Sequence, residues 1–248
     1  MPNNQRLTKL AASFRNAASS EFDRAVKKLI ALAWEYGEPT DNFLWETNPE
    51  MDAKANEILR ELSDNLARKA KETARSAIAN ELEFLDFNEL WDEANGDDGG
   101  ATLLFRFDMQ GSHIKELLAI WIALAAVNHI GKTHLRILIS RYINNPFTAP
   151  LWKGIPLDAL RWGSGYSKNI VAQLAVIGQN AIVAAKRLAE WKEAAENGAD
   201  YYIRRRGSNY DCKECDALCN KPIPMDVPFE FLHSNCMCYA EYHYPDKY

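Results

Sequence analysis

All five cysteines of this 248-residue chain lie within one short window near its C-terminal end, between positions 212 and 238. The window reads Cys212-Lys-Glu-Cys215, then Cys219, then His233-Ser-Asn-Cys236-Met-Cys238. Two thiolates separated by two residues can hold one ion from a single tight turn. A second turn carrying His and Cys can complete a tetrahedron of nitrogen and sulfur ligands, the arrangement that suits zinc. The spacing therefore predicts a bound Zn²⁺.

The second half of the motif offers three candidate ligands where two are needed. The set that we expect first is Cys212, Cys215, His233 and Cys236. Cys238 follows closely as a candidate, and Cys219 is the residue most easily left outside the site. The spacing does not decide which four of these six side chains bind the metal.

The cysteine window is also compatible with two other kinds of site. Disulfides or free buried thiols are the alternative to a metal, but disulfides need an oxidising compartment and five cysteines leave one unpaired. A catalytic zinc would keep an open position and place a carboxylate base beside the metal, whereas this window can saturate the ion with its own side chains. We therefore expect a structural zinc knuckle that folds around its metal.

Composition and charge limit the classes of partner. The chain is 47% hydrophobic and 25% charged, which is typical of a globular protein, and its net charge is −5. An acidic balance disfavours broad, non-specific binding to nucleic acid, so any DNA contact would have to be local. The longest apolar run, Leu117 to Val127, is shorter than the ~18 residues needed to span a bilayer, and we expect no stable membrane insertion. The first residues read as an amphipathic helix and predict no export signal.

The first two-thirds of the chain predict long amphipathic helices. Apolar residues recur every three or four positions from Leu7 to about Tyr36 and again from about Glu50 to Leu85. The stretch Thr47-Asn48-Pro49-Glu50 supplies capping residues and a first-turn proline for the second of these helices. The residues expected on their buried faces are Phe22, Val26, Leu29, Ile30 and Ala33, then Ala55, Ile58, Leu59, Leu62, Leu66, Ala70, Ala74, Ala77, Ile78, Leu82 and Leu85.

The middle of the chain is expected to be less regular. Asn95 to Gly100 reads as a loop, Thr102 to Phe107 as a short strand, and Asp108 to Gly111 as a turn after which Ser112 caps the next helix. A helix containing Leu117 to Val127 then ends near Gly131, and another follows from Lys132 to Asn144. The stretch through Pro150 and Pro156 is expected to be a loop packed down by Trp152 and Trp162.

The last third predicts a long helix from about Ser167 to Glu196, stopped by Asn197-Gly198. Tyr201 to Ile203 and Tyr239 to Tyr244 read as paired strands with the metal window between them. The predicted fold class is therefore mainly α, with a small C-terminal β-hairpin zinc knuckle (α+β). We expect two parts, a helical body over 1–164 and the long helix with its zinc-knuckle module over 165–248.

About residues 165 to 244 resemble the minor head proteins of tailed phages, the head-morphogenesis family named after protein F of phage Mu. The resemblance lies in a long helix, an aromatic strand, C-x-x-C, a proline-bearing loop and a His-x-Asn-Cys-x-Cys ending. The matching residues are Cys212, Cys215, His233, Asn235, Cys236 and Cys238. Ser234 and Met237 depart from the family, which has a proline after the histidine and a basic residue between the last cysteines.

The resemblance implies a virion component made in the bacterial host cytoplasm and located in the capsid interior or at the portal vertex. It implies portal or capsid proteins as partners, with a role in head assembly and contact with packaged DNA or its ejection. The function expected is that of a non-enzymatic structural protein, in which long helices bind neighbouring subunits and the zinc knuckle fixes one end of the fold.

Two features leave room for other functions. A local basic patch consists of Arg204, Arg205 and Arg206. It would contact DNA phosphates or an acidic partner, or else lie on a solvated strand edge.

The alternative function is a zinc-dependent hydrolase or nuclease acting at DNA entry. The polar groups near the window that such an enzyme would use are Asp211, Glu214, Glu230 and His243. The H-E-x-x-H and H-x-E…P-C-x-x-C patterns of zinc enzymes are absent. A zinc-binding regulator on nucleic acid is a third reading, which the acidic balance disfavours.

Overall fold

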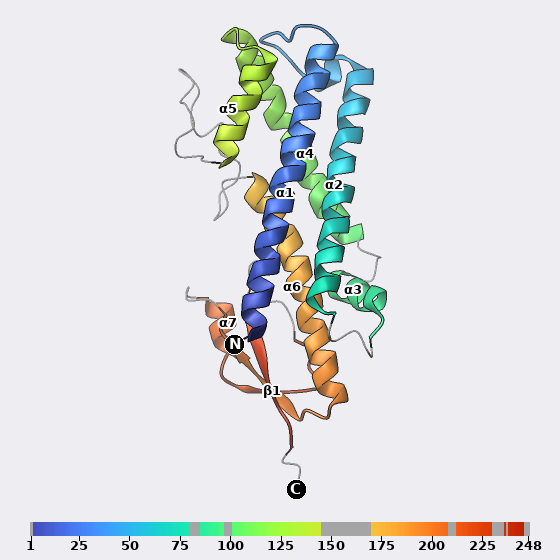
Figure 1. Cartoon of the computed structure of the whole chain (residues 1–248), viewed down its shortest axis with the longest axis vertical. Helices are drawn as coiled ribbons and strands as arrows, with labels where there is room; N and C mark the ends of the chain where they lie inside the picture. The colour runs from blue at the N-terminus through green and yellow to red at the C-terminus, as the bar shows by residue number, and fades with distance from the viewer. Residues whose placement is uncertain are drawn as a thin grey trace. The chain divides into compact units, whose positions relative to one another are not determined.

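The computed structural model of the chain is mainly helical and carries a small antiparallel sheet near its C-terminus, as the sequence predicted (Figure 1). The structure describes residues 2–79, 85–96, 101–144, 170–207, 212–229, 236 and 238–245. The chain divides into two compact units. The first comprises Met1–Phe14, Lys69–Leu103 and Val176–Tyr248, and the second Arg15–Arg68 and Leu104–Ala175. The predicted boundary at residue 164 lies outside the described residues.

Helices α1 (Pro2–Glu35) and α2 (Pro49–Ala77) confirm the first two predicted helices, although α2 ends at Ala77 and does not reach Leu85 as predicted. The described apolar residues expected on their buried faces are buried except Ile58 and Leu85, which are half-buried, and Leu82 lies outside the described residues. Asn48 caps α2 as predicted, because its Oδ1 accepts hydrogen bonds from the backbone N–H groups of Glu50 and Met51, both at 3.1 Å. A short 3-10 helix, η1 (Trp45–Thr47), precedes this cap.

Helix α3 (Phe87–Asn95) was not predicted. Asp86 caps it, accepting hydrogen bonds from the backbone N–H groups of Asn88 at 2.7 Å and Glu89 at 3.1 Å. Its apolar face buries Phe87, Leu90 and Trp91. An aspartate four residues before a leucine–tryptophan pair was the available signal. Of the predicted loop at Asn95 to Gly100, residues 97–100 lie outside the described residues.

Helix α4 (Ala101–Val127) corrects the prediction for the middle of the chain. Thr102 to Phe107 is not a strand, Asp108 to Gly111 is not a turn, and Ser112 caps nothing, because all of them lie inside this helix. Leu103 and Phe107 are both buried and four residues apart, so the helical period outweighs the local alternation of apolar residues. Gly111 is tolerated inside the helix, and a Cβ there would lie 3.5 Å from Leu59 Cβ.

Helices α5 (Lys132–Asn144) and α6 (Ile170–Glu196) confirm two further predictions. Helix α6 ends at the expected place, where Gly198 adopts a φ of +81° that favours glycine. The predicted start of α6 at Ser167 and the predicted anchors Trp152 and Trp162 lie outside the described residues. No described helix is both long enough and apolar enough to cross a membrane.

The C-terminal sheet has three described strands, β1 (Tyr201–Arg205), β2 (Pro222–Pro224) and β3 (Tyr239–His243), in the order β2-β1-β3. The predicted pairing is confirmed, since β1 and β3 are antiparallel with Tyr201 opposite His243 and Arg205 opposite Tyr239. Strand β2 was missed because two of its three residues are prolines, which argue against a strand. We call residues 201–245 the C-terminal module.

Candidate metal centre

The C-x-x-C half of the cysteine window is positioned by a short helix, α7 (Lys213–Leu218). Cys212 is the N-cap of this helix, and its Sγ accepts a hydrogen bond from the backbone N–H of Cys215 at 3.5 Å. Cys215 follows in the first turn and is buried. The two cysteines of the C-x-x-C half are thus held close together at the start of α7.

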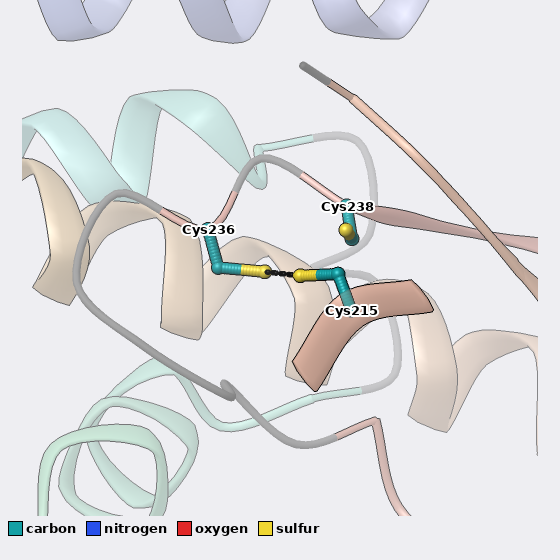
Figure 2. Close-up of side chains that lie close together, drawn as sticks. All are labelled: Cys215, Cys236 and Cys238. Carbon is teal, nitrogen blue, oxygen red and sulfur yellow. Dashed lines mark hydrogen bonds between the residues drawn. The ribbon is translucent and has the colours of Figure 1, made fainter. Parts of the chain in front are cut away.

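The C-x-C half leads directly into β3, and it meets α7 across the module. Cys215, Cys236 and Cys238 are all buried, and their three sulfurs lie within 4.8 Å of one another. We call these three residues the three-cysteine cluster. Figure 2 shows the side chain of Cys215, on α7, and that of Cys236, on the segment before β3, directed toward each other. Residues 21 positions apart in the sequence thus contribute to one site.

The sulfur spacing fits a shared ion. The Sγ atoms of Cys215 and Cys236 are 3.8 Å apart. Two sulfurs on one tetrahedral ion with bonds of ~2.3 Å would be separated by about 3.8 Å, whereas a disulfide bond is ~2.05 Å long. All five cysteines are free thiols. The three-cysteine cluster could therefore bind a metal ion without large movement of the backbone.

The surroundings of the cluster are apolar. It belongs to a small core with Cys219, Tyr202 and Phe229, against which Trp191, Ile223, Met225 and Tyr242 also pack. The hydroxyl of Tyr202 donates to the carbonyl of Pro228 at 3.3 Å, which fixes the segment leading to Phe229. These aromatic residues were not predicted to surround the site, although the alternation of side chains along β1 was a signal that Tyr202 faces inward.

Burial and mutual hydrogen bonding set the protonation of the three thiols. Burial raises the pKa of Cys215 to about 12. The interaction with Cys238, together with burial, raises the pKa of Cys236, while the same interaction with Cys236 lowers the pKa of Cys238. Cys238 is therefore the first of the three to ionise, and a cation is needed to hold all three as thiolates.

The remaining candidate ligands have different positions. Cys212 is half-buried and packs against the core that contains the cluster. Cys219 is buried at the C-cap of α7, where its backbone N–H donates to the carbonyl of Cys215 at 2.8 Å, and its sulfur is not part of the three-cysteine cluster. His233 and Asn235 lie outside the described residues. The structure thus brings together Cys215, Cys236 and Cys238, with Cys212 beside them.

The three arginines of the predicted basic patch are all engaged. Arg204 is 2% exposed and its guanidinium stands 4.1 Å from the centre of the Phe229 ring. Arg205 donates to Glu241 at 2.6 Å and to Asn220 at 2.8 Å, and the hydrogen bond from Arg205 lowers the pKa of Glu241. Arg206 forms an ion pair with Asp216 at 2.7 Å. Two of these charges are balanced on the surface, and the third belongs to the core of the module.

The groups proposed for an enzymatic reading are dispersed. Glu214 is exposed on α7, and Asp211 and Glu230 lie outside the described residues. His243 stacks on Tyr201 with ring centres 4.6 Å apart, and its Nε2 is 3.7 Å from Glu241. It is five positions along the chain from Cys238, a distance of about 16 Å at the ~3.3 Å rise of a strand. His243 is therefore at the opposite end of β3 from the cysteines.

The chain was compared with protein-family models, with curated proteins and with solved structures, and no match was found in any of the three comparisons.

Proposed function

We propose that the C-terminal module holds one structural Zn²⁺ through Cys215, Cys236, Cys238 and Cys212. The observation that carries this proposal is the 3.8 Å separation of the Cys215 and Cys236 sulfurs inside a buried apolar core. Thiolate ligands favour zinc over the hard cations magnesium and calcium, and a set of four thiolates matches its tetrahedral preference. Cys212 takes the fourth position because it caps the helix that carries Cys215.

A structural role follows from the closed surroundings of the ion. Four cysteine sulfurs fill the coordination sphere and leave no position for a substrate or an activated water. The module is too small to be stabilised by its apolar core alone, so the free energy of metal binding becomes free energy of folding. The metal ties α7 to the start of β3, and these two segments are joined through an intervening stretch of chain that contains β2.

We further propose that the whole chain is a non-enzymatic minor head protein of the head-morphogenesis type, located in the capsid interior or at the portal vertex. Its partners would be portal or capsid proteins, with packaged DNA as a local contact. The support is the motif resemblance of residues 165–244 together with two described features that suit it. These are long helices that offer extended contact surfaces and a terminal module whose buried cysteines could bind a metal ion. The ion pairs of Arg205 and Arg206 would have to open for DNA phosphates to bind there.

Metal content and cysteine substitutions test the zinc site. We expect purified protein to contain one zinc per chain and to lose thermal stability in a strong chelator. Cys215→Ser should abolish zinc binding, while Cys219→Ser is the matched control, since Cys219 is equally buried in the same helix region but outside the cluster. Cys212→Ser should weaken zinc binding more than His233→Ala does. A metal-free protein, or one whose module stays folded in chelator, would overturn the proposal.

Isolation of virions tests the biological role. Particles purified from infected cells should contain this chain in association with portal or capsid proteins, and heads made without it should be defective in assembly or in DNA delivery. Zinc-dependent nuclease or peptidase activity of the purified chain, lost with zinc removal, would contradict the non-enzymatic assignment. Absence of the chain from particles, with normal heads in its absence, would contradict the assembly role.

A further inference from the structure

A second surface of the chain, remote in sequence from the cysteines, has the properties of a protein-docking groove. It lies in the compact unit formed by Arg15–Arg68 and Leu104–Ala175 and has a volume of about 620 Å³. The segment 41–46 forms one wall and α4 forms the other. Its apolar lining consists of Phe43, Leu44, Trp45, Ala119, Ile120, Ala123 and Leu124.

The wall of the groove is held rigidly against α4. The indole N–H of Trp45 donates to the backbone carbonyl of Lys115 at 2.9 Å, and Trp45 is buried. The ring of Phe43 packs edge-on against Trp45 with centres 5.1 Å apart. The groove is therefore formed before any partner arrives, which reduces the entropy lost on binding.

Apolar side chains are left exposed inside this groove. Leu44 is 54% exposed on one wall and Ile120 is 44% exposed on the other. Ala119 and Ala123, one helical turn apart on α4, leave room between them for a side chain from outside. Large apolar side chains that flank a hollow are what a helical partner needs to bury its own apolar stripe.

The polar groups of the groove do not suit a small polar ligand. The Trp45 indole N–H is already used by the Lys115 carbonyl, and the Lys115 ammonium is paired with Asp52 and with Asn56 Oδ1. Small-molecule sites rely on a few placed polar groups to orient the ligand, and these groups are already occupied. The floor of the groove thus offers apolar contact area, and the charged groups left to a partner are the carboxylates at its edges.

The rim of the groove is acidic. Asp41, Glu46 and Glu116 are exposed at its edges. The one basic group of the lining, Lys115, lies 3.7 Å from Glu46 and is balanced by Asp52. A partner that combines an apolar stripe with flanking lysines or arginines would match both the floor and the rim, because opposite charges at a rim favour the correct partner and repel acidic ones.

We propose that this groove binds a basic amphipathic helix presented by another protein, with apolar side chains seated between Leu44 and Ile120 and with cationic side chains facing Asp41, Glu46 and Glu116. The inference goes beyond the proposed metal site and does not depend on it. It adds a partner class, a cationic helical segment, for a surface to which the head-morphogenesis resemblance assigns nothing.

The test uses synthetic helical peptides of about 18 residues with leucine at i, i+3, i+4 and i+7 spacing. One carries lysine and arginine on the flanking positions, a second carries glutamate there, and a third has the basic flanks with serine in place of leucine. Fluorescence anisotropy of the labelled peptides against the full zinc-loaded chain measures the affinity. The basic amphipathic peptide should bind at least tenfold more tightly than either of the others.

Substitutions locate the binding. Leu44→Ser and Ile120→Ser should each weaken the basic peptide at least fivefold, whereas Ile137→Ser, an exposed apolar residue of α5 outside the groove, should not change its affinity. Asp41→Lys with Glu116→Lys should transfer the preference to the acidic peptide. Circular dichroism of each variant checks that its helices are intact.

Several results would overturn the inference. They are no binding of the basic amphipathic peptide, equal binding of the basic and acidic peptides, or unchanged affinity in both serine variants. Self-association of the chain that Ile120→Ser abolishes would assign the groove to a second copy and would also overturn it. None of these results bears on zinc content, so the two proposals fail separately.

Discussion

The ring of Phe14 on α1 occupies the space in which a side chain at position 178 of α6 would begin. A Cβ built on Gly178 would overlap Cε1 and Cζ of this ring and would stand 3.0 Å from its Cδ1. Phe14 is buried, so its ring has little room to move. The two helices come close at this point because residue 178 has no side chain.

Gly178→Ala should therefore destabilise the protein, although alanine normally favours a helix. Overpacking of a core costs about 1–3 kcal/mol, which exceeds the ~1 kcal/mol that alanine contributes to a helix interior relative to glycine. Urea unfolding followed by circular dichroism would measure this loss in the free energy of unfolding.

Gly111→Ala is the matched control for this substitution. Gly111 is also a helix-interior glycine, but a Cβ there would lie 3.5 Å from Leu59 Cβ, an ordinary contact. This variant should be neutral or stabilised by up to ~1 kcal/mol. If Phe14 causes the penalty, then Phe14→Leu should cost less in the Gly178→Ala background than in the parent protein. Equal behaviour of the two glycine substitutions would contradict the explanation.

Metal retention should weaken as the pH falls. Burial raises the pKa of Cys215 to about 12, and the pKa of Cys236 is raised as well, so the metal-free site holds protons that the metal-bound site does not. Since the metal-bound form carries fewer protons, acidification favours release and higher pH favours binding. Competition with a chromogenic chelator at neutral and mildly acidic pH would show this trend. Affinity independent of pH would contradict ligation by these thiols.

Arg204→Ala should destabilise the C-terminal module more than Arg205→Ala. The guanidinium of Arg204 is buried over Phe229, where a desolvated cation–π contact contributes ~2 kcal/mol or more. Arg205 is paired with Glu241 on the surface, where water and salt screen the charges and such pairs add little to stability. Denaturant unfolding of the zinc-loaded variants measures the loss in the free energy of unfolding for each substitution. A larger loss for Arg205→Ala than for Arg204→Ala would contradict the assignment of Arg204 to the core and Arg205 to the surface.

Asn48→Ala should lower the free energy of unfolding by about 1 kcal/mol, because its Oδ1 satisfies two backbone N–H groups at the start of α2. Asn42→Ala serves as the control, since the Asn42 amide donates only to the neighbouring Asp41 among the interactions resolved for it. Thermal unfolding would separate the two variants. Replacement of Asn48 by Asp should preserve most of the stability, since aspartate also caps a helix N-terminus.

The long helices could be predicted from the sequence because their apolar residues keep one period over many turns. Phe22, Val26, Leu29 and Ile30 defined the buried face of α1 without ambiguity. The part of α4 before Ser112 was predicted wrongly. The run from Thr102 to Phe107 is too short to distinguish the alternation of a strand from the period of a helix, and Gly111 suggested a turn. Burial of Leu103 and Phe107 on one face decides in favour of the helix.

The site could be predicted only as a set of candidates. The spacing of the cysteines identified the window, but the ranking of ligands depends on the path of the chain between Cys219 and Cys236. Cys238 joins Cys215 and Cys236 because it directly precedes Tyr239, the first residue of β3, which lies opposite Arg205 of β1. The groove beside Trp45 was not predicted, because it arises from two segments that only the tertiary fold brings together, such as Trp45 and Lys115, which are 70 positions apart.

Strand β2 forms one margin of the C-terminal sheet, and Pro222 and Pro224 account for two of its three residues. Proline nitrogens carry no hydrogen, so neither Pro222 nor Pro224 can donate a hydrogen bond to another strand. A neighbouring chain that tried to extend the sheet there would find no N–H donor at two of the three positions. This margin therefore resists the addition of a strand from another chain, which lowers the tendency of the protein to aggregate through this sheet.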